Sequence, residues 1–264
     1  MIFFCFGDSI TSDECTGTGS LVGRMLNADV IRNYAHGNAT SSDWFTGDER
    51  ITKTNVDLPP DCWFSDNTLY NQVVKALSDT APYGKELEWK YADGAETFSV
   101  SGVTGAGISK DPDVIYIAIG TNDGRAPENR FFDDCETVVK QKYSELTRRG
   151  LASSLRWAIE TLQCVYPACL IFVATPLKSD LGPYRDCEWL GDSSAFSAEV
   201  QDKKAGIIRE IAGYCACPVV DTYMRSGVSR QMIRKFGDQI GIHPDEFLKN
   251  KIAKFVAGEI RALL

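Results

Sequence analysis

The sequence predicts an α/β protein in which a five-stranded parallel sheet lies between two layers of helices. Five short apolar runs, each ended by a turn signal, alternate with segments whose apolar residues recur at helical spacing. This alternation is typical of a parallel sheet with helical crossovers. A chain of 264 residues, 44 % of them hydrophobic, can also build a sizeable core. We therefore expect one three-layer α/β/α domain over residues 1–264.

The predicted strands are near-continuous apolar runs, as expected for strands buried on both faces. They cover residues 2–6, 30–36, 113–119, 169–174 and 218–221. The clearest helical stripes cover residues 151–162, 198–214 and 248–263.

Two segments are longer than a crossover needs, and we interpret them as insertions around 41–111 and 178–198. The first should hold a helix near residues 69–77 and either a hairpin or an irregular excursion over 85–103. Its aromatic residues could line a substrate cleft or form a satellite core beneath a long loop: Trp44, Trp63, Phe64 and Tyr70.

The first strand ends in Gly7-Asp8-Ser9, which places a hydroxyl where open α/β sheets have their ligand crevice. Gly7 allows a sharp turn, and the helix expected after Ser9 would point its N–H groups at the site. A serine nucleophile needs this exposure, fixed position and nearby donors. A second Gly-Asp-Ser triplet at 191–193 follows no buried strand, and we interpret it as a surface loop.

Serine needs a base, and the chain has two histidines, His36 and His243. His243 precedes Pro244 and an amphipathic C-terminal segment that could hold it against Ser9. His36 is a possible base by position alone. We favour His243, because His36 adjoins Gly37, a glycine suited to approach a substrate closely.

Asn122 follows the third strand, within Gly120-Thr121-Asn122-Asp123. Because the carboxyl ends of parallel strands share one edge, its amide should lie near Ser9 and could donate to a developing oxyanion. Gly37, after the second strand, could offer a backbone N–H to the same place. Alternatively, Asn122 is an ordinary turn residue at a strand end.

In chain order, these four motifs resemble the SGNH hydrolase superfamily, the GDSL lipases and esterases. The resemblance spans essentially the whole chain and implies a flavodoxin-like α/β/α fold with five parallel strands. It implies Ser9 as nucleophile and His243 as base. It also implies an oxyanion hole built from the Ser9 N–H, the Gly37 N–H and the Asn122 side chain, with no cofactor.

The acidic member of the site departs from this family. The family usually has an aspartate three residues before the histidine, where this chain has Ile240. A two-residue insertion, Gln239-Ile240, would let Asp238 take that role. Alternatively, a backbone carbonyl orients His243 and the site is a Ser–His dyad.

The sequence therefore predicts a serine ester hydrolase acting on a small-molecule ester or an acylated carbohydrate. A non-catalytic module that binds carbohydrate or another ligand in the same crevice is the alternative, favoured by the missing acid at Ile240. A flavin- or nucleotide-binding protein of the same fold is a weaker third hypothesis.

Composition narrows the partners and the compartment. A formal charge of −8 disfavours nucleic acid, and no 18-residue apolar run predicts a membrane span. The N-terminus shows no basic region or cleavage site, so we expect a cytoplasmic protein, with secretion of a processed form left open. Nine scattered cysteines favour reduced thiols. Cys215 and Cys217 lack the spacing and partners of a metal site.

Overall fold

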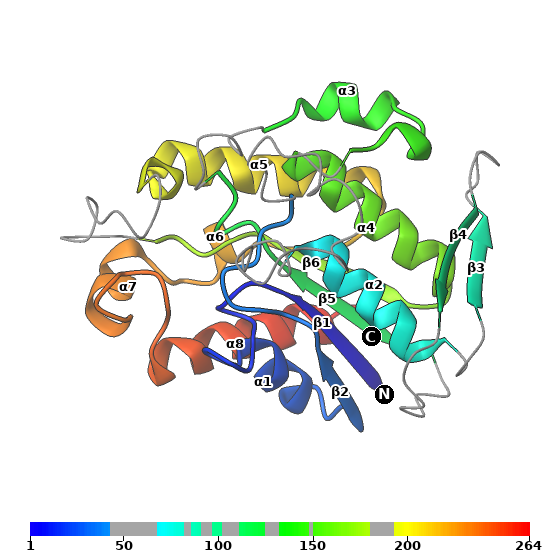
Figure 1. The fold of residues 1–264 in the computed structure, drawn as a ribbon. Coiled ribbons are helices and arrows are strands. Elements are labelled where there is room, and N and C mark those ends of the chain that lie inside the picture. The colour runs from blue at the N-terminus through cyan, green and yellow to red at the C-terminus, as the bar shows by residue number, and fades with distance from the viewer. Residues whose placement is uncertain are drawn as a thin grey trace, which may run out of the picture.

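The computed structural model describes residues 1–42, 68–81, 111–124, 132–147, 150–179 and 193–264, and the backbone of 86–90 and 97–101. It is a three-layer α/β/α structure, which confirms the predicted fold class (Figure 1). Most of the two predicted insertions lies outside the described residues, including Trp44, Trp63 and Phe64.

The central sheet has five strands in the order β2-β1-β5-β6-β7, and all are parallel. The strands are β1 (Ile2–Gly7), β2 (Val30–Asn33), β5 (Val114–Ala118), β6 (Leu170–Ala174) and β7 (Val219–Val220). This is the flavodoxin-like order, in which β2 lies at one edge of the sheet and β1 lies between β2 and β5. The carboxyl ends of β1 and β5 are in register, with Gly7 opposite Ala118.

Helices cover both faces of the sheet, with α1 and α8 on one face and α2, α4 and α5 on the other (Figure 1). The helices are α1 (Thr18–Met25), α2 (Leu69–Thr80), α3 (Cys135–Lys140), α4 (Leu151–Val165), α5 (Ala198–Tyr214), α6 (Thr222–Arg225), α7 (Arg230–Phe236) and α8 (Glu246–Arg261). Two 3-10 turns, η5 (Tyr143–Glu145) and η8 (Ser193–Phe196), complete the described helical elements.

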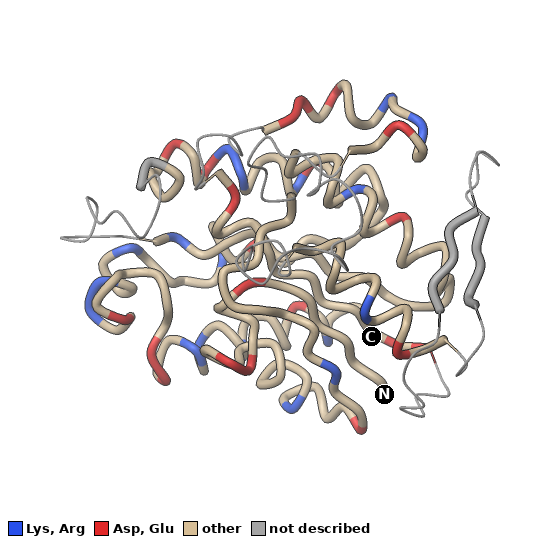
Figure 2. Tube along the Cα trace, in the orientation of Figure 1, with Lys and Arg blue, Asp and Glu red and all other residues tan. Residues whose placement is uncertain are grey.

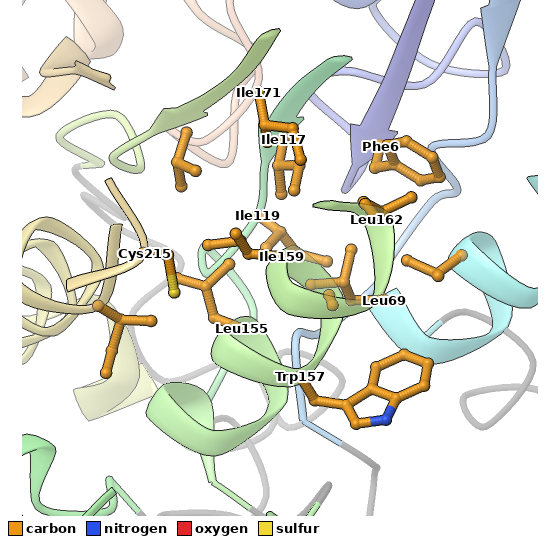
Figure 3. Close-up of a cluster of buried hydrophobic side chains, with 14 of the residues drawn as sticks. Phe6, Leu69, Ile117, Ile119, Leu155, Trp157, Ile159, Leu162, Ile171 and Cys215 are labelled. Atoms are coloured by element: carbon orange, nitrogen blue, oxygen red, sulfur yellow. The ribbon is translucent and has the colours of Figure 1, made fainter. Parts of the chain in front are cut away.

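Alternate side chains of β1 enter opposite halves of the core, as a two-residue strand period requires. Phe4 and Phe6 pack toward α2 and α4, whereas Phe3 and Cys5 pack toward α1 and α8. Figure 3 shows Phe6 in the first of these clusters. Each fully buried phenylalanine contributes about 1.5–3 kcal/mol by leaving water. The sheet is therefore held from both sides.

The described part of the first insertion contributes to the core and adds a hairpin. Tyr70 of α2 is 9 % exposed and its ring centroid lies 4.7 Å from that of Trp157, so it belongs to the core and not to a substrate wall. Strands β3 (Glu86–Lys90) and β4 (Thr97–Ser101) pair antiparallel. Of the two alternatives for residues 85–103, the hairpin is the one observed.

The structure places two local features differently from what the sequence suggests. No helix starts at Ser9; residues 8–16 form turns and α1 begins at Thr18. The Asp8 carboxylate accepts the Ile10 N–H at 3.0 Å and so stabilises a tight turn in place of a helix. The second strand ends at Asn33, whose side chain accepts the Ala35 N–H and turns the chain early.

Acidic and basic residues are intermixed along the described chain (Figure 2). Among the described residues, we find no helix with the length and apolar character of a membrane span.

Gly7 should be the least replaceable glycine of the sheet. A Cβ there would lie 2.2 Å from the Ala118 carbonyl oxygen and 2.7 Å from the Thr11 hydroxyl. We expect Gly7→Ala to destabilise the protein by about 1–3 kcal/mol or more through overpacking. Gly258→Ala is the matched control, because nothing lies within 4 Å of that Cβ in α8 and alanine is the better helix former. Urea unfolding should show opposite signs for the two variants; equal effects would contradict this explanation.

Candidate active site

Ser9 lies on a turn that is fixed on several sides. It is 6 % exposed. The buried Gln72 side chain of α2 accepts the Gly7 N–H and donates to the Gly7 carbonyl, both at 2.8 Å. The Asp8 carboxyl beside it is fully buried, and this desolvation raises its pKa. The serine hydroxyl is thus presented by backbone that has little freedom to move.

His243 is held in a closed loop between α7 and α8. Gly237 and Pro244 form an antiparallel bridge, and the Asp238 N–H donates to the His243 carbonyl at 2.7 Å. The Gly241 N–H closes a turn by donating to the Asp238 carbonyl, with Gly241 at φ 75°. This loop pairs Asp238 with His243 across four intervening residues. Because this turn brings the two side chains together, Asp238 contacts His243 although it is two residues farther away in sequence than the family's aspartate.

The structure brings Ser9, His243 and Asp238 into one hydrogen-bonded chain. His243 Nε2 lies 2.7 Å from Ser9 Oγ, and His243 Nδ1 lies 2.7 Å from Asp238 Oδ2. The second carboxylate oxygen, Asp238 Oδ1, accepts the N–H groups of Ile242 and His243 at 3.1 and 3.2 Å. This is the geometry of a serine nucleophile, a base and an acid that orients the base.

The electrostatics agree with this arrangement. Partial burial acts to raise the pKa of Asp238, but the hydrogen bonds from the His243 ring and the Ile242 N–H outweigh it and lower that pKa below its ordinary value of 3.8. Asp238 is therefore a carboxylate at neutral pH. A carboxylate at Nδ1 favours the tautomer that leaves Nε2 ready to accept a proton.

The alternative base, His36, does not contact Ser9. Its Nε2 lies 3.5 Å from Glu14, and the side chain is 48 % exposed. Its backbone N–H donates to the Gly7 carbonyl at 3.1 Å. His36 thus anchors the loop that carries Gly37 beside the turn that carries Ser9, by its backbone N–H and by ring contacts to Glu14 and to the Gly37 carbonyl.

The loop that carries Asn122 is tied to the loop that carries Gly37. Asn122 Nδ2 donates to the Ala39 carbonyl at 3.0 Å, which fixes the plane of the amide. The buried Asp123 carboxylate accepts from the backbone and the hydroxyl of both Ser41 and Ser42, at 2.6–3.1 Å. These contacts hold together, at the edge of the sheet, the two loops that carry the predicted oxyanion donors Gly37 and Asn122.

Sequence reasoning missed three buried polar residues close to the candidate site: Gln72, Asp123 and Lys204. Asp123 had a usable sequence signal, because it directly follows Asn122 at the end of the predicted third strand. Gln72 and Lys204 lie within amphipathic helices, where a polar residue normally faces water. Only the tertiary packing places them against backbone groups.

The described cysteines are free thiols, and those weighed for metal lie in the core. Cys215 and Cys217 are buried, and desolvation raises the pKa of each to about 12. Metal ligation needs the thiolate, which this environment disfavours. Within the described ranges, no group of three potential metal ligands occurs. Cys62 and Cys187 lie outside them.

Comparison with known proteins identifies the fold. No family model matches the chain, and no curated protein matches it. Solved structures do match over nearly the full length of both chains. They include the lipase/acylhydrolase from Enterococcus faecalis, at 16 % identity and a TM-score of 0.55, with 100 % of this chain and 97 % of that chain covered.

A carbohydrate acetylesterase from Sinorhizobium meliloti matches at 17 % identity and a TM-score of 0.54, with 99 % of each chain covered. A protein from Slackia heliotrinireducens whose name marks it as an SGNH hydrolase matches at 12 % identity and a TM-score of 0.50, with 98 % of each chain covered. The chain therefore has the SGNH hydrolase fold.

The lowered pKa of Asp238 predicts a pH-dependent contribution to stability. A carboxyl whose pKa is lower in the folded than in the unfolded state stabilises the fold above the unfolded value. That contribution is lost as pH falls below about 3.8 and through the folded pKa. We expect Asp238→Asn to be less stable than the wild type at pH 7, and the gap in free energy of unfolding to narrow towards pH 3. Urea titrations at several pH values measure this, and a constant gap would contradict it.

Proposed function

We propose that this protein is a serine ester hydrolase. The observation that carries the proposal is the continuous chain from Ser9 Oγ through the His243 ring to Asp238, with both contacts at 2.7 Å. Serine, histidine and carboxylate groups in this order serve nucleophilic acyl transfer on several unrelated folds. The esterase and acylhydrolase names of similarly folded proteins support the same reaction class.

In the proposed mechanism, His243 Nε2 accepts the Ser9 proton while Ser9 Oγ bonds to the ester carbonyl carbon. The carbonyl electron pair moves to oxygen, and the Ser9 N–H, the Gly37 N–H and the Asn122 amide donate to that oxyanion. When the intermediate collapses, the alkoxide leaves and takes the proton from His243. Water then attacks the acyl-serine with His243 again as base, which releases the acid and restores the Ser9 hydroxyl.

Asp238 acts through His243. Its carboxylate fixes the tautomer and stabilises the imidazolium that forms in each half-reaction. The proposed site is therefore a triad and not a dyad. The missing acid at Ile240 had favoured a non-catalytic binding module. The 2.7 Å contact between Asp238 and His243 Nδ1 supports the catalytic proposal instead.

The proposed substrates are small esters and acylated carbohydrates. A crevice at the carboxyl edge of the sheet suits a small molecule. The similarly folded acetylesterase is named for a carbohydrate substrate, and we extend that class to this chain as part of the proposal.

An ester panel tests the function. We expect the wild type to hydrolyse at least one of a series of aryl esters of graded acyl length and acetylated sugars. Ser9→Ala should abolish this turnover, because the proposed mechanism forms the acyl-enzyme on the Ser9 hydroxyl. Ser12→Ala is the matched control, since Ser12 lies on the same turn and its hydroxyl accepts only the nearby Glu14 N–H among the described contacts. Equal turnover by wild type and Ser9→Ala would overturn the proposal.

A further inference from the structure

One fully buried lysine lies close to the proposed site and has no part in the mechanism above. Lys204, in α5, is 0 % exposed. Its ammonium donates to two backbone carbonyls, those of Thr121 and Ala195, both at 3.0 Å. It also lies over the Phe196 ring, 5.6 Å from the centroid. Burying an ammonium is costly, so these contacts must be well formed for the fold to retain it.

The first carbonyl belongs to the loop that carries Asn122. The Thr121 carbonyl and the Asn122 N–H are parts of one planar peptide group, so an ammonium that holds the carbonyl also fixes the backbone from which the Asn122 side chain projects. The preceding residue, Gly120, has φ 115°. A glycine in that conformation supplies little stiffness of its own. The Lys204 contact therefore orients the loop from outside.

The second carbonyl belongs to η8, which packs on the histidine loop. Ala195 and Phe196 form a small apolar cluster with Ile242, the residue directly before His243, and Ile240 packs against it. η8 is held to α5 by a second contact, because the buried Gln201 Nε2 donates to the Phe196 carbonyl at 3.0 Å. The same ammonium thus touches the loop of the oxyanion donor and the segment that supports the base.

We infer that Lys204 is a positioning residue that sets the Asn122 oxyanion donor against the His243 loop. This inference rests on the proposed function, since the quantity that it controls is the stabilisation of the oxyanion. Lys204 acts through the Thr121–Asn122 peptide and does not itself contact the reacting atoms. A small displacement of such a donor lowers the rate of the chemical step more than it weakens substrate binding, because the charge on the carbonyl oxygen develops only in the transition state.

A double-mutant cycle with Asn122 tests the inference. The variants are Lys204→Met, Asn122→Ala and the two together, with kcat and KM measured on the best ester of the panel. Lys204→Met removes the ammonium but keeps the unbranched stem. Lys203→Met is the matched control, because Lys203 is the neighbour of Lys204 on the same helix and its side chain is exposed. Circular dichroism and urea unfolding report whether each variant is folded.

We expect Asn122→Ala to lower kcat by ~10²–10³. Lys204→Met should lower kcat by about 10–100-fold with KM changed less than about twofold, whereas Lys203→Met should match the wild type. In the Asn122→Ala background, Lys204→Met should lower kcat by less than a further factor of about three. The reason is that the amide that Lys204 positions is already absent.

Additive losses in the cycle would overturn the inference, and so would a kcat for Lys204→Met equal to that of Lys203→Met. A wild type that hydrolyses no ester would instead overturn the proposed function. If Lys204→Met does not fold, Lys204→Gln enters the same cycle, since its amide keeps a donor for one carbonyl. A smaller loss of kcat for Lys204→Gln in the Asn122→Ala background than in the wild type would then support the inference. Additive losses of kcat would contradict it.

Discussion

The backbone of Gly7 is where the segments of the site meet. Its N–H and carbonyl bond to the Gln72 side chain, and the same carbonyl accepts the His36 N–H. The next N–H, that of Asp8, reaches the Ala118 carbonyl. These contacts are possible only because Gly7 has no side chain: a Cβ would occupy the space that the Ala118 carbonyl needs. The absence of one methyl group thus lets the loop after β2, the loop after β5 and the turn that carries Ser9 converge.

A buried carboxylate (Asp123), a half-buried carboxylate (Asp238) and a buried ammonium (Lys204) then hold the loops that diverge from this point. Asp123 ties the Asn122 loop to the Ser41-Ser42 segment, Asp238 closes the histidine loop, and Lys204 joins the Asn122 loop to η8. A buried charged group that loses its partners costs several kcal/mol, so each such group strongly disfavours any other loop arrangement.

The fold was predictable because its signals are local. Each buried strand is an apolar run with a clear end, and the parallel topology alone brings the groups after β1, β2 and β5 to one edge. Ser9 and Asn122 were predicted as site residues in this way, and His243 from the scarcity of histidines. The Asp8 side chain stops a helix after Ser9, which requires knowing where that carboxyl points. Asp238 stayed ambiguous because loop closure and not residue spacing pairs it with His243. Lys204 follows a helical pattern that predicts exposure, and only the packing of α5 against η8 reveals its partners.

The central claim is that Ser9 is a nucleophile activated by His243, and covalent labelling tests it most directly. A fluorophosphonate reacts with an activated serine hydroxyl, so peptide mapping by mass spectrometry should find one adduct per chain, at Ser9. His243→Ala should slow the labelling strongly and Ser9→Ala should abolish it, while His36→Ala should leave its rate unchanged. An adduct at Ser193, or none on protein that hydrolyses esters, would contradict the account.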